Sequence, residues 1–311
     1  MTVSRAVNSP DQMPASTLEK VRLAIARTGY VPNQIAGGLR SSRSRLVSMV
    51  VPTIAGSVFL ETIQSLTASL AARGYSMMLG QSGYAPSFED ELLRAIIGRR
   101  PDGIVIAGVM HSPESQKLLI SSGIPVVETW DLTPKPIDML VGFSHKRVGG
   151  AVCRYLFDSG RRRLALIGGN DERSRRRATA FVTMAKRLGM ADVVLRFVPA
   201  PTTVASGRSA IAEILQTAKV DAVFCSSDLL ALGVLIEARA AHIRVPGQLA
   251  VVGFGDVAFA ADLDPPLTSV RIDGMRIGRD AARCIMERID GTGPARSRID
   301  VGFTIVQRAT A

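Results

Sequence analysis

The sequence predicts an α/β protein with two doubly wound subdomains, each built on a parallel sheet, behind a short helical segment at the N-terminus. From residue 46 onward, short runs that are apolar on both faces alternate with amphipathic helical stretches. This alternation is typical of parallel sheets that helices cover on both sides. The alternation starts again near residue 143, which predicts a second half-set. Ligands of such sheets bind beyond the carboxyl ends of the strands, so we expect a site in the cleft between the halves.

The first half-set begins with the apolar run Leu46–Val51, which ends at Pro52. Apolar residues then recur at helical spacing from Phe59 to Leu70, before Gly74 ends the helix. A second helix is expected at 91–99, and further strands at 76–80, 103–107 and 124–128.

The second half-set has the same pattern. We expect strands at 164–168, 193–198, 222–225 and 249–253, and helices at 148–159, 179–188, 206–217 and 229–241. The chain is expected to cross between the subdomains at 142–143, at 268–272 and after Gly291. The first subdomain then comprises 46–142 with 272–292, and the second comprises 143–271 with 293–311.

Composition favours an ordinary globular protein with a polyanionic partner. Of the 311 residues, 47% are hydrophobic and 21% charged, and the net charge is +11. Residues 1–45 contain seven Lys and Arg against Asp11 and Glu19, so this segment alone contributes +5. Such a balance suits nucleic acid; the alternative is a generally basic, solvated surface.

Cysteine usage and hydropathy indicate a soluble, cytoplasmic protein. Cys153, Cys225 and Cys284 lie far apart in apolar stretches and form neither a metal-ligand pattern nor a disulfide framework. We therefore expect buried, reduced thiols. No export leader opens the chain, and no apolar run reaches the ~18 residues of a membrane span.

Several short motifs of the first 41 residues occur in a specific order. Residues 1–8 are followed by the helical pattern 17–26, by Gly29-Tyr-Val-Pro-Asn33 and by Ile35-Ala-Gly-Gly-Leu-Arg-Ser41. This order resembles the lactose-repressor (LacI) family, in which a recognition helix, a third helix and a hinge follow one another. The resemblance implies a partial helix-turn-helix head at 1–30, a hinge helix and linker at 31–45, and a periplasmic-binding-protein-like domain at 46–311 for effector binding and dimerisation. Because the chain starts inside the recognition helix, either translation begins upstream or the product lacks half of its DNA-binding fold.

The resemblance extends over the whole chain. The segments 226–233, 252–256 and 264–269 look like family segments that follow core strands. Within the family, the segments 126–132 and 137–144 look like the gluconate-type repressors.

The head and the hinge supply the residues that the resemblance places on DNA. A recognition helix lies in the major groove, where Thr and Ser suit phosphate oxygens and Arg can bind guanine with two hydrogen bonds. In the head these residues are Thr2, Ser4, Arg5 and Asn8. The alternative for them is a frayed N-terminus.

In the hinge, the resemblance implies that Asn33 and Ala36 contact DNA. Leu39 matches a family leucine that inserts between two base pairs in the minor groove. Ile35 and Ala36 would pair the hinges of a dimer. Gly37-Gly38 departs from the family pattern and costs helix stability. The alternative is a flexible linker with one exposed leucine.

A basic cluster of four arginines follows the expected strand at 164–168. Arg173, Arg175 and Arg176 are interpreted as a solvated face, as charge runs usually are. Arg177 stands where the family has an arginine that reaches the cleft, although Ala180 replaces the family's glycine. A guanidinium fork suits a carboxylate or a phosphate, so this residue predicts an acidic sugar as the effector.

Five further polar residues are candidate effector ligands. Asp228 and Ser227 follow a strand and could accept or donate hydrogen bonds to sugar hydroxyls; the alternative for both is capping of the next helix. Glu128 also lies at a strand end, where an exposed carboxylate is the alternative. Asp256 stands one residue later than the family's acid, and Ser144 with His145 replaces a common Asp-Asn pair.

These expectations together describe a homodimeric transcriptional repressor without a cofactor. Its partners would be double-stranded operator DNA and a sugar acid such as gluconate or phosphogluconate. The main alternative is a cytoplasmic sugar-acid-binding sensor fragment that no longer binds DNA; a periplasmic sugar receptor would need an export leader. An enzyme is not expected, because the sequence has no phosphate-binding glycine loop, no nucleophile elbow and no metal-binding histidine set.

Overall fold

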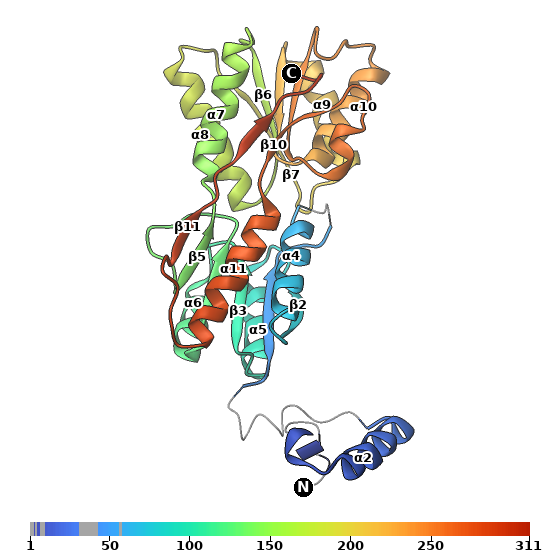
Figure 1. Cartoon of the computed structure of the whole chain (residues 1–311). Helices are drawn as coiled ribbons and strands as arrows, with labels where there is room; N and C mark the ends of the chain where they lie inside the picture. Colours follow the sequence, from blue (N-terminus) through green and yellow to red (C-terminus); the bar gives the residue numbers. More distant parts are fainter. Residues whose placement is uncertain (1–2, 4, 7–9, 31–42, 56–57) are drawn as a thin grey trace.

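The computed structural model describes residues 3, 5, 6, 10–30, 43–55 and 58–311. Two six-stranded sheets form two subdomains that are stacked along the long axis of the molecule (Figure 1). Helices cover both faces of each sheet, and all strand pairs are parallel except one in the second sheet. The predicted fold class is confirmed.

The first sheet has the strand order β11-β5-β4-β3-β1-β2. Its strands are β1 (Leu46–Val51), β2 (Ser76–Gln81), β3 (Gly103–Ala107), β4 (Val126–Thr129), β5 (Met139–Gly142) and β11 (Arg298–Asp300). The helices around it are α4 (Leu60–Ala71), α5 (Pro86–Ile97), α6 (Pro113–Ser122) and α11 (Gly274–Ile289). Buried valines, isoleucines and methionines of the central strands pack against these helices and form the core of this subdomain.

The second sheet has the order β12-β10-β9-β8-β6-β7. Its strands are β6 (Leu164–Gly169), β7 (Val194–Val198), β8 (Ala222–Cys225), β9 (Ala250–Gly255), β10 (Thr268–Arg271) and β12 (Thr304–Val306). Helices α7 (His145–Asp158), α8 (Glu172–Arg187), α9 (Val204–Thr217) and α10 (Asp228–Ala240) cover it, and a short 3-10 helix, η2 (Ala258–Ala261), follows β9.

The chain crosses between the subdomains after β5, after β10 and between β11 and β12. The first two crossings fall in or next to the expected regions. One boundary differs from the prediction, which gave residues 293–311 to the second subdomain. Arg298–Asp300 instead pairs in parallel with β5 of the first sheet, so the last crossing lies at 301–303. Three residues of mixed polarity at an edge give too weak a pattern to identify such a strand.

The N-terminal head contains η1 (Pro10–Gln12) and α2 (Ala15–Thr28), where the third helix of the head was expected. Gly29 ends α2 in a left-handed conformation with φ of 62°, which glycine adopts without steric cost. Helix α2 buries none of its residues and lies apart from the two sheets (Figure 1). Val3, Arg5 and Ala6 are helical, and Arg5 is exposed. The other predicted DNA contacts lie outside the described residues: Thr2, Ser4, Asn8, Asn33, Ala36 and Leu39.

The cysteines are buried and unpaired, as expected. Burial raises the pKa of Cys153 and of Cys284 to about 11, so both thiols are protonated at neutral pH. Within the described part of the chain, no helix has the length and apolar character that a membrane crossing requires.

Candidate functional site

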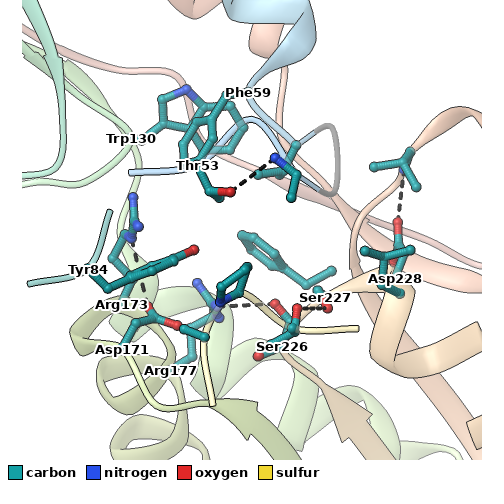
Figure 2. A pocket seen from close by; sticks show the side chains of 18 of the residues that line it. Thr53, Phe59, Tyr84, Trp130, Asp171, Arg173, Arg177, Ser226, Ser227 and Asp228 are labelled. Atoms are coloured by element: carbon teal, nitrogen blue, oxygen red, sulfur yellow. Dashed lines mark hydrogen bonds and ion pairs between the residues drawn. The ribbon is translucent and has the colours of Figure 1, made fainter. Parts of the chain in front are cut away.

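A pocket lies in the cleft where the carboxyl ends of strands from both sheets meet (Figure 2). The empty space between its walls measures about 730 Å³, including the part open to solvent. Thr53, Phe59, Tyr84 and Trp130 come from the first subdomain. The second subdomain contributes most of the charged and polar lining: His145, Asp171, Arg173, Arg177, Thr202, Ser226, Ser227 and Asp228.

Arginines of α8 form one wall of the pocket. Asp171 caps this helix by accepting a hydrogen bond from the Ser174 backbone N–H at 3.1 Å. The cap fixes the first turn, so Arg173 and Arg177, four residues apart, lie on the same helix face and both line the pocket. The predicted effector residue Arg177 is therefore in the cleft.

Arg177 is buried and tightly held. Its Nη1 lies 2.8 Å from Nδ1 of His145, its Nη2 donates to the Ser226 carbonyl at 3.2 Å, and its guanidinium carbon lies 4.0 Å from the centre of the Phe254 ring. Burial lowers the pKa of Arg177 to about 10, so the side chain still carries its charge at neutral pH. Its Nε is buried and has no hydrogen-bond partner among the described residues. That N–H is an unsatisfied donor of a side chain that lines the pocket.

His145 helps to orient this arginine. Burial, followed by the charges of Arg177 and Arg173, lowers the pKa of His145 well below 6.5. The imidazole is therefore neutral, and its Nδ1 accepts the hydrogen bond from Arg177. Helix α7 brings His145 close because Gly149 allows it to approach α8: a Cβ at this position would lie 2.1 Å from the Arg177 carbonyl oxygen.

Of the other three arginines in the cluster, which were all expected on a solvated face, two lie elsewhere. Arg175 is exposed and binds Asn170, as expected for a solvated side chain. Arg173 lines the pocket and is only 17% exposed, and Arg176 crosses the cleft to Asp131 of the first subdomain, with Nη1 2.8 Å from Oδ2. The interpretation of these two residues as a solvated face is therefore wrong. Helix α8 begins at Glu172, so the whole arginine run is helical and points to several sides.

Polar groups at the start of α10 form the opposite wall. Ser227 caps α10 by accepting from the Leu230 N–H at 3.3 Å, and its hydroxyl also shares a hydrogen bond with Thr202. Asp228 is buried and accepts hydrogen bonds from the Ser269 hydroxyl at 2.6 Å and the Val257 N–H at 2.9 Å. Burial raises the pKa of Asp228 to about 6, against the effect of these two donors. Both residues line the pocket where they were expected, and Ser227 also has the alternative role of a cap.

Aromatic rings complete the enclosure. The ring of Phe59 contacts Trp130 edge to face with centroids 5.0 Å apart, and Trp130 contacts Phe143 at 5.8 Å. Phe143 in turn contacts Phe254 of the second subdomain at 6.1 Å, so the aromatic series continues across the cleft. Apolar walls with a few convergent polar groups are typical of sites for small polar ligands.

Three predicted effector residues do not line this pocket. Glu128 is buried, accepts a hydrogen bond from the Ile137 N–H at 2.6 Å and lies 3.5 Å from His111. Ser144 caps α7 through the Arg147 N–H, and the carboxylate of Asp256 binds Arg308 at 2.5 Å. Structural partners occupy the polar groups of all three side chains. We therefore withdraw all three as effector ligands.

The contacts of His111 with Glu128 and Glu89 predict that the stability of the fold depends on pH. Burial lowers the pKa of His111, but the contacts with Glu128 and with Glu89, 2.9 Å away, outweigh it and raise the pKa to about 9. Since the folded pKa lies above the unfolded value of 6.5, the stabilisation is complete below pH 6.5 and is lost as pH rises through 9. Urea unfolding between these limits should show a fall of about 2 kcal/mol that His111→Gln removes. Equal pH profiles for the two proteins would contradict this assignment.

Sequence reasoning missed Arg173 and the aromatic walls. The spacing of Arg173 and Arg177, four residues apart, could have placed both on one face once the helix was known to begin at Glu172. The signal for that start was the sequence Asn170-Asp171, directly after a strand, with Asp171 as a favourable cap. Nothing in the local pattern could indicate that Tyr84 and Trp130 face the cleft.

Comparisons with known proteins agree with this fold. Residues 153–311 match the family model of the periplasmic binding protein-like domain. The regulator GntR of Pseudomonas aeruginosa, an HTH-type transcriptional regulator, is 34% identical over 99% of this chain and 91% of its own length. A LacI-family regulator from Silicibacter pomeroyi has a similar structure, with a TM-score of 0.93 and 31% identity over 100% of this chain and 95% of that one.

A second solved structure, the transcription regulator GntR from Chromobacterium violaceum, has a TM-score of 0.82 at 34% identity, covering 85% of this chain and 98% of that one. The similarity thus includes the sequence and both subdomains. The chain belongs to the LacI family of transcriptional regulators and is similar to its GntR-type members.

Proposed function

We propose that this regulator represses transcription by binding operator DNA as a homodimer, and that a sugar acid such as gluconate or phosphogluconate bound in the cleft controls this binding. The single observation that carries the proposal is the buried Arg177 in the pocket, with its charge retained and its Nε unpaired. A buried guanidinium with a free N–H favours an anionic ligand group.

The two walls of the pocket favour a ligand with an acidic end and a hydroxyl-bearing remainder. Figure 2 places Arg173 and Asp171 at one side of the pocket, Asp228 at the other and Arg177 between them. The arginines suit a carboxylate or phosphate, whereas Asp228, Ser227 and Thr202 suit hydroxyl groups.

Exposed apolar side chains support a homodimer. Leu79 on the edge strand β2 is 42% exposed and Leu60 on α4 is 47% exposed. In the second subdomain, Ile236 on α10 is 39% exposed, and α10 lies on the same side of the molecule as α4 and β2 (Figure 1). A second copy that covers this side of both subdomains would also bring two heads together, as a palindromic operator requires.

The basic head supports DNA as the partner. The exposed Arg5 and the net charge of +5 in residues 1–45 can displace counterions from a duplex. The proposed coupling runs through closure of the subdomains: a ligand that changes their relative position also changes the spacing of the hinges in a dimer.

Selection of bound duplexes from a random DNA pool tests the function directly. The full chain should enrich a palindromic sequence, and its affinity should fall steeply with salt. Adding gluconate, but not glucose, should change binding to the enriched duplex. If no sequence is enriched while gluconate still binds, the chain is the sensor without DNA binding that we consider the alternative.

A further inference from the structure

We infer that Arg173 is the second ligand of the effector's anionic group and determines the preference for acids over neutral sugars. This inference rests on the proposed function, because it assumes an acidic effector in the pocket. It assigns a direct role to a residue that sequence analysis placed on the solvated surface.

The guanidinium of Arg173 lies in the pocket with unused hydrogen-bonding capacity. Its Nη1 is buried and has no hydrogen-bond partner in the part of the chain that the structure describes. Its Nε lies 3.8 Å from Asp171 Oδ1, which is an ion-pair distance but too long for a hydrogen bond. A buried donor without a partner is costly, so an oxygen of a ligand would find a favourable position there.

The charged side chains that line this side of the pocket have a net positive charge that one anion would neutralise. Arg173 and Arg177 contribute two positive charges, and Asp171 contributes one negative charge. His145 is neutral because its pKa is lowered, and the positive charge of Arg176 is matched by Asp131. The three charged groups of this wall that line the pocket, Arg173, Arg177 and Asp171, therefore sum to +1, which a single carboxylate would neutralise; Asp228 lies on the opposite wall.

The two arginines differ in how firmly they are held. Arg177 is fixed by His145, the Ser226 carbonyl and the Phe254 ring. Arg173 has the weaker Asp171 pair and a contact of its guanidinium carbon with the Phe59 ring, whose centre is 5.4 Å away. Arg177 thus offers a preformed donor, and Arg173 can adjust to close over the same anionic group.

This arrangement also connects the subdomains. Arg173 extends from α8 of the second subdomain, and Phe59 belongs to the first subdomain. An anion bound at Arg173 therefore lies between the two subdomains. A hydroxyl of a neutral polyol could accept a hydrogen bond at the same place, but it lacks the negative charge that makes the contact of an acid with a guanidinium stronger.

The test uses the single tryptophan of the chain, Trp130, which lines the pocket and reports binding by its fluorescence. Gluconate, phosphogluconate and the neutral polyol glucitol are titrated into the wild type, Arg173→Gln, Arg173→Lys and the exposed control Arg175→Gln. We expect Arg173→Gln to weaken both acids by about 10- to 100-fold, as for loss of a charged hydrogen bond. Arg173→Lys should recover part of this loss, and Arg175→Gln should stay within about threefold of the wild type.

Glucitol affinity, however weak, should be nearly equal in all four proteins. The inference would be overturned if Arg173→Gln bound both acids within threefold of the wild type. It would also be overturned if Arg173→Lys bound them as weakly as Arg173→Gln, because the positive charge would then not contribute to binding. A wild type that binds glucitol better than both acids would instead refute the proposed function. The ratio between the two acids distinguishes a carboxylate from a phosphate as the anionic group.

Discussion

Replacing Arg177 with alanine should abolish the response to sugar acids. The variant removes the buried guanidinium that faces the pocket and leaves the acid of the ligand without its fixed partner. Loss of one member of a buried ion pair costs about 3–5 kcal/mol, which corresponds to a loss of affinity of more than about 100-fold. Calorimetric titration of gluconate and phosphogluconate into the variant measures this loss.

The matched control is Arg175→Ala, two residues away on the same helix. Arg175 is exposed and binds Asn170 outside the pocket, so its loss should change affinity little. Arg177→Lys separates charge from shape, because lysine keeps the charge but cannot reproduce the contacts with both His145 and Ser226. Wild-type affinity in Arg177→Ala, or a preference of the wild type for glucose over the acids, would refute both the residue and the ligand class.

Replacing Leu39 with alanine should weaken operator binding by about 2–3 kcal/mol while effector affinity stays unchanged. Leu39 matches the hinge leucine that, by resemblance to the family, unstacks a minor-groove step; alanine is too short to act as this wedge. The residue lies outside the described part of the structure and far in sequence from the pocket lining. A gel-shift titration with the selected duplex measures the loss.

The control for this variant is gluconate titration by Trp130 fluorescence, which should give wild-type affinity. Size-exclusion chromatography should show the same oligomeric state for both proteins. If Leu39→Ala binds the duplex as tightly as the wild type, the leucine takes no part in the DNA contact.

The fold could be predicted from the sequence because its determinants are local. Runs such as Leu46–Val51 are apolar on both faces, and β1 has neighbours on both sides. Elements with weak patterns were predicted less well. Arg298–Asp300 has only three residues and a single apolar one, Ile299, and its partner β5 lies more than 150 residues earlier in the chain.

The candidate site could be predicted only in part. Arg177, Asp228 and Ser227 were found because position after a strand and resemblance to family motifs both indicated them. Glu128 and Asp256 also follow this rule, yet their carboxylates bind partners elsewhere. Position along a strand shows which end of the sheet a residue occupies, but the direction of the side chain and the presence of a competing partner depend on tertiary packing.

The arginine run shows the same limit. Four basic residues in five positions suggest a solvated face, and for Arg175 this is correct. Helical geometry turns Arg173 and Arg177 toward the pocket and Arg176 toward Asp131 across the cleft. Because Asp131 has a buried carboxylate that needs a partner, this contact could be recognised only once both subdomains were placed together.

The measurement that tests the central claim most directly is reciprocal titration of the full chain with the selected duplex and gluconate. Operator affinity is measured by fluorescence anisotropy with and without saturating gluconate, and gluconate affinity is measured with and without saturating duplex. Because coupling between two sites is reciprocal, both affinities should change by the same factor, about 5- to 150-fold for a typical regulator. Affinities that do not depend on the other ligand would show that the cleft and the head are not coupled, and would contradict the account.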